Sequence, residues 1–376
     1  MSDPVPVLDR DAAEPPPAGP PAPAERRPGR WEVLLTPLAA HQAAVVRIGV
    51  ALAWGGFLLR EWPHRRVLYG DLSPWSSDLS RQLLADTHAF TVLGRSSDRW
   101  WFELVYHLAI LASAALLLGW RTRASSVLFA VTAVSLQNRN ILVGDGGDNV
   151  VHLLAIYLAL TRCGLVWSLD ARRRARRSPA GPAAGEQPGE QPGKPPGEVR
   201  AVLDALASML HNCAMLVIAV QVVLIYSTAG WYKIQGSRWQ DGTAVYYPLH
   251  LGYFSPWPAL SGLLGAGLLT TVALSYGTVV AQVAFPFTLA NRRLKNVLLA
   301  LMMAEHAAIA VTLGLPFFSL AMIAADAVFL PTGALRRLER WAVGLLGLLG
   351  LAGPAGPAGS AGLVERPAEG SRPESG

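Results

Sequence analysis

Apolar residues in this chain are collected into long runs, and polar residues fall between them in mostly short connections. A helix needs about 20 residues to cross the apolar core of a bilayer, and several runs have that length. The pattern predicts eight helical spans, at roughly 43–60, 102–119, 124–140, 148–166, 203–230, 262–290, 296–314 and 316–331. We therefore expect an all-α, polytopic transmembrane helical bundle of about eight spans.

Three segments have no such run. Residues 1–40 are rich in Pro, Ala and charge and lack the apolar core of a signal peptide, which predicts a disordered cytoplasmic arm. Arg, Pro, Gly and Glu at 171–200 predict a flexible cytoplasmic linker that interrupts the membrane domain, 41–332. Residues 333–376 hold an apolar stretch too short to span, so we expect a short interfacial helix and a disordered tail there.

Composition and charge support a membrane protein. Charged residues make up 15% of the chain, whereas a soluble domain carries about 25%, and this deficit argues against a soluble enzyme. The net charge of +6 comes from arginine clusters between apolar runs. Such clusters are typical of the loops that orient membrane helices and not of a nucleic-acid-binding surface. The two cysteines, Cys163 and Cys213, lie in apolar stretches, so a disulfide scaffold is not expected.

The basic connections predict the orientation of the chain. In an eight-span topology the clusters at 121–123, 171–177, 292–295 and 336–340 all fall on one side. Because cytoplasmic loops carry the excess of Lys and Arg, both termini are predicted to be cytoplasmic. The longer 61–101 connection also carries arginines, but the rule weakens for long loops; its spaced leucines favour an amphipathic helix on the outer bilayer surface.

Lys233 is singled out by composition and position. The chain has 32 basic residues, of which three are lysines: Lys194, Lys233 and Lys295. Tyr226, Gly230 and Lys233 fall on one helical face at the outer end of the fifth span, and Tyr226 is a candidate substrate-binding residue there. A buried lysine, unlike arginine, can become a neutral base, whereas the alternative is an anchor that snorkels to the interface.

Other polar residues lie in predicted spans or in their connections, and burying an ionisable side chain at membrane depth costs free energy. Glu305 and His306 lie in the middle of the seventh span, point about 100° apart, and are candidate catalytic residues or structural hydrogen-bonding groups. Trp239 and Tyr247 are candidates for a substrate pocket or for an interfacial belt. Asp148 and Asn149 either wall an outward-facing site or cap the fourth helix. For Asp326 we expect a structural role, and we find no metal-ligand motif.

Taken together, residues of about 40–332 resemble the HTTM domain, the transmembrane domain of vitamin K-dependent γ-glutamyl carboxylases and of many bacterial membrane proteins. The resemblance rests on the order of several short motifs and not on any one of them. They are Asn138-Arg139-Asn140, Asp145-Gly146-Gly147-Asp148-Asn149, Trp167-Ser168-Leu169-Asp170, the stretch from Tyr226 to Lys233 followed by Trp239, and His306 ahead of Gly314 and Phe318.

The resemblance implies that Lys233, which follows the Ala229-Gly230 pair, deprotonates a quinol such as menaquinol. The histidine that animal carboxylases carry at the start of the fourth span has no equivalent here, so the type of reaction stays open. One hypothesis is a quinol-linked enzyme that modifies an exported peptide at an outward-facing site. The alternative, on a resemblance to proteins encoded with sporulation-delaying toxins, is a non-catalytic factor for maturation of, or immunity to, a secreted peptide. The Arg-, Ala- and Gly-rich composition is typical of a high-GC bacterium, which favours the plasma membrane.

Overall fold

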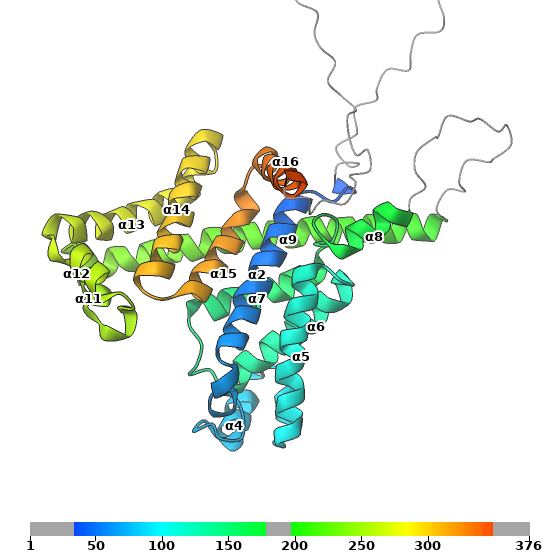
Figure 1. Ribbon diagram of the computed structural model, residues 1–376, viewed down its shortest axis with the longest axis horizontal. Helices are drawn as coiled ribbons and strands as arrows, with labels where there is room; N and C mark the ends of the chain where they lie inside the picture. The colour runs from blue at the N-terminus through cyan, green and yellow to red at the C-terminus, as the bar shows by residue number, and fades with distance from the viewer. Residues whose placement is uncertain (1–33, 178–196, 349–376) are drawn as a thin grey trace, which may run out of the picture.

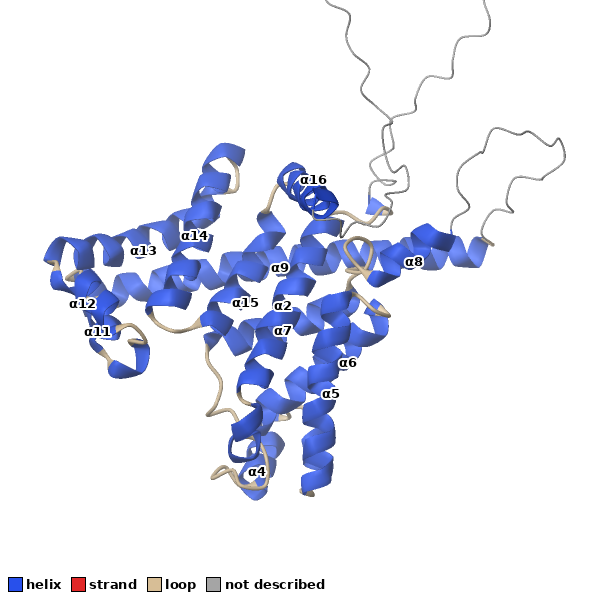
Figure 2. Cartoon of the chain, in the orientation of Figure 1, coloured by secondary structure: helices blue, strands red, loops and turns tan. Residues whose placement is uncertain are grey.

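The computed structural model describes residues 34–177 and 197–348, and within these ranges it contains helices and no strands (Figure 1, Figure 2). Most of the predicted arm, linker and tail lies outside the described residues. The ends of the linker are helical, because α8 covers Leu169–Arg177 and α9 already begins at Glu198. The predicted interfacial helix is also longer than expected, since α16 begins at Thr332.

The helices fall into two sets on either side of α8. The first set is α2 (Ala40–Arg60), α3 (Arg65–Leu68), α4 (Ser77–Thr87), α5 (Arg99–Leu118), α6 (Thr122–Arg139) and α7 (Gly146–Leu160). The second is α9 (Glu198–Gln235), α10 (Ser237–Gln240), α11 (Tyr246–His250), α12 (Pro258–Ala266), α13 (Leu268–Thr288), α14 (Arg292–Thr312), α15 (Pro316–Asp326) and α16 (Thr332–Leu348). The helix expected in the 61–101 connection is α4.

Helices occupy all eight predicted places, but within residues 34–177 and 197–348 five are long and apolar enough to cross a membrane: α2, α5, α9, α13 and α14. Helix α6 buries several hydroxyl side chains and is too polar, and α7 has only 15 residues. The chain bends by 115° between the α15 segment and α16, and a sixth span results if that pair is counted as one. The structure is thus consistent with a multi-pass membrane protein, and the count of eight spans stays a prediction.

The long helices pack in a closed ring. Going around it, α2 contacts α5, then α6, α7, α9, α13, α14 and α15 follow, and α15 returns to α2. Helices α7 and α15 also contact each other and so join the two sets. The approach of α2 to α15 needs a glycine, because a Cβ on Gly49 would lie 2.4 Å from the Cβ of Ala324. In Figure 1, α9 runs at a steep angle to α2 and α5.

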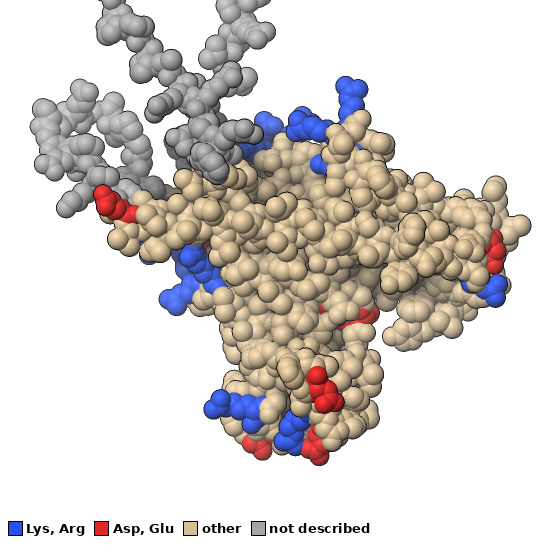
Figure 3. Space-filling model, turned by 180° about the vertical axis from the view of Figure 1, so that it is seen from behind, with Lys and Arg blue, Asp and Glu red and all other residues tan. Residues whose placement is uncertain are grey.

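The outer surface of the ring is largely apolar. Large hydrophobic side chains are exposed along α9, α13 and α14, among them Leu216, Val280 and Val297. In Figure 3 the charged side chains gather at the edges of the visible face and leave a broad surface between them free of charge. Such a surface would aggregate in water, so its natural solvent is the acyl-chain region of a bilayer.

A buried arginine ties the first helices together at one end. Arg47 of α2 is fully buried, and its guanidinium donates to the carbonyl oxygens of Leu116 and Leu117 at the end of α5. It also donates to the carbonyls of Cys163 and Trp167, in the connection from α7 to α8, at 3.2 and 2.7 Å. The last carbonyls of a helix lack an intrahelical partner, and Arg47 supplies donors at the end of α5, where the Leu116 carbonyl also accepts from the backbone N–H of Gly119.

Asp170 of α8 caps α6 from outside. The residue that precedes α6, Arg121, offers no side-chain acceptor, and Asp170 accepts instead from the backbone N–H groups of Arg121 and Thr122 at 3.0 and 2.7 Å. The Thr122 hydroxyl also donates to it, at 2.8 Å. Burial by itself would raise the pKa of Asp170, but these hydrogen bonds outweigh it and lower the pKa below its ordinary value.

We expect Asp170→Ala to destabilise the protein by about 1–2 kcal/mol, because the first turn of α6 loses its acceptor. Since the pKa is lowered on folding, the contribution of the wild-type carboxylate is present above its unfolded pKa and is lost as the pH falls below about 4. Thermal unfolding in detergent at several pH values checks this. Asp86→Ala, at an exposed position of α4, is the control and should change little.

A topology test addresses the span count. Fused after Arg177, a periplasmic reporter such as alkaline phosphatase should be inactive, and fused after Val143 it should be active. The first position is cytoplasmic in the eight-span topology and the second is outside, provided that α6 crosses the membrane. Activity after Arg177, or the same result at both positions, would contradict the eight-span arrangement.

Candidate functional site

The predicted face of α9 packs against α13. Tyr226 and Gly230 are buried on that face, and Lys233 lies half-buried at its end. A Cβ on Gly230 would lie 2.8 Å from Cγ2 of Val283 and 3.1 Å from its backbone nitrogen, so the two helices approach closely only because this residue is glycine. This contact brings Lys233 level with Gln282, one residue before Val283.

Lys233 and Glu305 are brought together through a third side chain. Nζ of Lys233 donates to Oε1 of Gln282 at 2.8 Å, and Nε2 of Gln282 donates to Oε1 of Glu305 at 3.4 Å. Gln282 is buried, so the bonds at its two ends fix which way its amide points. An uncharged amide therefore separates the amine from the carboxylate, and α9, α13 and α14 each supply one member of the chain.

Of the two aromatic residues predicted for a substrate pocket, Trp239 lies beside the Lys233 amine and Tyr247 does not. Nζ of Lys233 lies 5.2 Å from the ring centroid of Trp239, within the range of a cation–π contact. Tyr247 instead lies against Arg238, at 5.1 Å. The side chains of Trp231 and Tyr232 are exposed on α9, so the aromatic residues of this region do not all close over Lys233.

His306 lies on the next face of α14, as its position after Glu305 predicts. Its ring is buried between those of Tyr226 and Phe318, with centroid distances of 6.2 and 5.5 Å. Neither ring nitrogen has a hydrogen-bond partner among the described residues. A buried imidazole without partners is unusual, because leaving such a group unsatisfied costs free energy.

Tyr226 is paired with Asp326, which the sequence analysis assigned only a structural role. The Tyr226 hydroxyl lies 2.9 Å from each carboxylate oxygen of Asp326, and both side chains are fully buried. The bond joins α9 to α15 across one hundred residues of sequence. Sequence analysis also missed Gln282. An acidic residue at membrane depth was the available signal for Asp326, whereas nothing marked Gln282.

Asp148 and Asn149 lie at the start of α7, in the first helix set, and not beside Lys233. Asp145 is the N-cap of α7 and forms a capping box with Asp148, so the capping interpretation holds for Asp148 and not for Asn149. Asn149 accepts from the Gln137 side chain at 3.0 Å. Both residues also line a polar cavity of about 230 Å³ between α2, α6 and α7. Nε1 of Trp54, which lines the same cavity, is buried with no partner among the described residues.

Phe318 of α15 lies between the cavity lined by Asp148 and Asn149 and the polar side chains around Lys233 and His306. A Cβ on Gly147 would lie 2.6 Å from Cα of Phe318, while the Phe318 ring packs against His306 on α14. The structure therefore does not bring Asp148 and Asn149 to Lys233. It gives a polar cavity in the first helix set, and in the second a chain of polar side chains that begins at Lys233.

These groups can exchange protons but do not form a metal centre. Within residues 34–177 and 197–348, no three His, Cys, Asp or Glu side chains gather as a metal site would need. The two cysteines are unpaired there, Cys163 buried and Cys213 exposed. Lysine, carboxylate and imidazole side chains are the usual donors and acceptors of general acid–base chemistry.

We expect Tyr226→Phe to destabilise the protein by about 1–3 kcal/mol, because Asp326 would stay buried without its donor. In a double-mutant cycle with Asp326→Ala, the two residues should show a coupling free energy of about 0.5–3 kcal/mol. Thermal or denaturant unfolding in detergent measures both. Tyr276→Phe is the matched control, since the half-exposed Tyr276 hydroxyl donates to the Gln240 carbonyl at the surface and its loss should have little effect. Additive effects of Tyr226 and Asp326 would contradict the pairing.

Comparison of the chain with models of protein families, with curated proteins and with solved structures gives no match.

Proposed function

We propose that this protein is a multi-pass plasma-membrane enzyme of the HTTM type, in which Lys233 removes a proton from the hydroxyl of a quinol. The observation that supports the proposal is the hydrogen bond from Lys233 to the uncharged amide of Gln282 in a half-buried position. A carboxylate directly on the amine would favour its protonated form, whereas an amide oxygen accepts from the amine in either form.

The surroundings of Lys233 fit an aromatic lipid. The half-buried Lys233 lies near the end of α9 with its amine beside the indole of Trp239, and exposed apolar side chains continue from it along the helix. A quinol, when bound, supplies a weakly acidic aromatic hydroxyl. Lys233 would accept that proton at Nζ, Gln282 would hold the amine in place, and Glu305 would hold the amide of Gln282 through its second end.

A second candidate function rests on the other cavity. Trp54, whose buried Nε1 has no partner among the described residues, lines a cavity together with Asn, Gln and Asp side chains and with Tyr69, Ile141 and His152. Such a set suits the backbone of a peptide, because each amide offers both a donor and an acceptor. This observation favours a non-catalytic factor for the maturation of, or immunity to, a secreted peptide.

Substitutions at Lys233 separate the proposed base from an anchor. We expect Lys233→Arg to lower quinol turnover about as much as Lys233→Ala, by roughly 10²–10⁴-fold, since arginine stays protonated. Gln282→Glu should also lower it, because it puts a carboxylate directly on the amine. The measurement is menaquinol consumption by purified protein, with and without a candidate peptide, at matched levels of folded protein.

Lys295→Arg is the matched control, because Lys295 is a lysine of the neighbouring α14 whose amine donates to the Phe329 carbonyl instead. It should retain activity. An active Lys233→Arg protein would remove the base role from Lys233. If the wild-type protein consumes no quinol but binds the peptide, and Trp54→Phe weakens that binding, the second function is favoured.

A further inference from the structure

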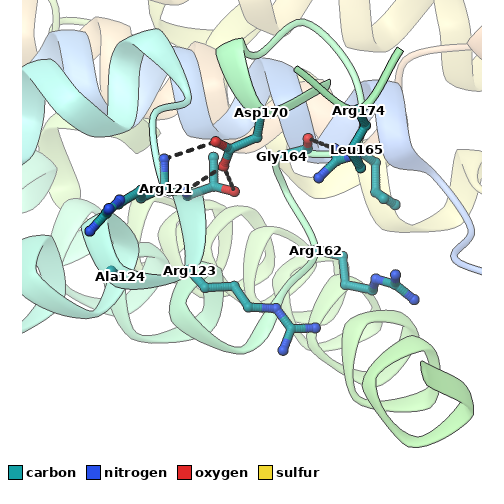
Figure 4. Close-up of a pocket in the computed structure, with 9 residues that line it drawn as sticks. Arg121, Arg123, Ala124, Arg162, Gly164, Leu165, Asp170 and Arg174 are labelled. Atoms are coloured by element: carbon teal, nitrogen blue, oxygen red, sulfur yellow. Dashed lines mark hydrogen bonds between the residues drawn. The ribbon is translucent and has the colours of Figure 1, made fainter. Parts of the chain in front are cut away.

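Four arginines line a pocket at the end of the molecule where α8 begins (Figure 4). They are Arg121, Arg123, Arg162 and Arg174, and we refer to this hollow of about 340 Å³ as the arginine pocket. Its walls come from the turn between α5 and α6, the connection after α7, and α8. Figure 4 shows Arg123 and Arg162 extending toward the same side of the pocket. None of these residues belongs to the sites described above.

The arginine pocket has one carboxylate in its lining against four arginines, so positive charge is in excess there. Asp170 is the acidic residue of the lining, and its oxygens are occupied by the start of α6. Arg162 donates to the Ser208 hydroxyl at 2.9 Å and lies 3.5 Å from the exposed carboxylate of Asp204. Among the described residues, the Arg123 side chain has no hydrogen-bond or ion-pair partner. The pocket therefore suits an anion.

Apolar surface begins immediately beside these charges. Trp120, Val127 and Leu160 have 43%, 51% and 46% of their surface exposed. Val127 follows Arg123 by one helical turn of α6, and Leu160 ends α7 two residues before Arg162. A free phosphate would leave this apolar surface uncovered, whereas a phospholipid would cover it with its acyl chains.

The predicted position of the arginine pocket, on the cytoplasmic side of the membrane, suits a lipid headgroup as its ligand. In the predicted topology the arginine pocket is on the cytoplasmic side, together with the arginines of α8. Basic pockets between helices on that side are suited to anionic headgroups, and each arginine near the surface adds to the attraction. Guanidinium groups also match phosphate oxygens in geometry, so the side chains that point into the pocket can each donate to one phosphate.

We propose that the arginine pocket binds the phosphate of an anionic phospholipid of the inner leaflet, whose acyl chains lie along Val127 and Leu160. Arg123 and Arg162, which extend toward the same side of the pocket, donate to the phosphate, and Arg121, whose guanidinium lies over the Trp120 ring, adds positive charge at the rim. Arg174 also donates to the Gly164 carbonyl and thereby shapes the floor of the pocket. A lipid bound there bridges α6, the α7–α8 connection and α8, and so stabilises the folded protein.

The test titrates the full-length, delipidated protein in detergent with dioleoyl phosphatidylglycerol and counts bound lipid by native mass spectrometry. Dioleoyl phosphatidylcholine is a comparison ligand with the same acyl chains and no net charge. Glycerol 3-phosphate is a second comparison ligand, with a phosphate and no acyl chains. Arg121→Gln/Arg123→Gln removes two arginines whose side chains hold no other helix. Arg292→Gln/Arg293→Gln, at the start of α14, is the control with the same loss of charge.

We expect phosphatidylglycerol to bind more tightly than either other ligand and to raise the melting temperature. In Arg121→Gln/Arg123→Gln its Kd should rise roughly 10- to 30-fold, with an unchanged melting temperature in the absence of lipid, while the control stays near wild type. Equal binding of phosphatidylcholine, or an equal effect of the control, would overturn the site. Tight binding of glycerol 3-phosphate would show a soluble phosphate ligand and overturn the lipid. The preference of the wild-type protein between lipids tests the proposal even if the variant does not fold.

Discussion

The rest of the fold depends on a fully buried positive charge. Arg47 lies within an apolar helix, where an unpaired guanidinium would cost several kcal/mol, and it is tolerated because carbonyl groups surround it. Those carbonyls come from the end of α5 and from the connection after α7, so one side chain fixes three segments. Gly119, at φ +68°, leaves room for it, because a Cβ there would lie 3.1 Å from Nη1 of Arg47. The same arrangement places Asp170 over the start of α6.

Among the described residues, the hydrogen bonds that join α9 to α13, α13 to α14 and α9 to α15 each have an uncharged side chain as one partner. Gln282 separates Lys233 from Glu305, and a hydroxyl of Tyr226 meets the carboxylate of Asp326. In a bilayer such hydrogen bonds join helices that lipid would otherwise separate, because apolar packing alone hardly distinguishes a neighbouring helix from an acyl chain. The bonds that hold α9 to its neighbours therefore also shape the candidate site, and stability and function are expected to respond together to substitutions there.

Among the described residues, six buried side chains have a nitrogen or oxygen without a hydrogen-bond partner, and two of them, His306 and Trp54, lie beside a candidate site. The ring of His306 lies beside that of Tyr226, which is bonded to Asp326, and Trp54 lines the cavity of Asp148 and Asn149. Folded proteins rarely leave such groups unsatisfied, and the exceptions are enriched where a ligand or a proton is handled. Gln42, Trp75, Ser261 and Ser319 also carry an unsatisfied atom, so a missing partner marks His306 and Trp54 only together with their position beside Lys233's neighbours and beside the cavity.

The sequence by itself determined what depends on local periodicity. It predicted the places of the helices, the shared face of Tyr226, Gly230 and Lys233, the divergence of Glu305 from His306, and the cap at Asp148, since each follows from 3.6 residues per turn or from a short turn motif. Only the tertiary structure decided the partners. Gln282 lies 49 residues from Lys233 and Asp326 lies 100 from Tyr226, and the acceptors of Arg47 come from two other segments. Which helix faces meet is fixed by packing around the whole ring, and no pattern within one helix contains that information.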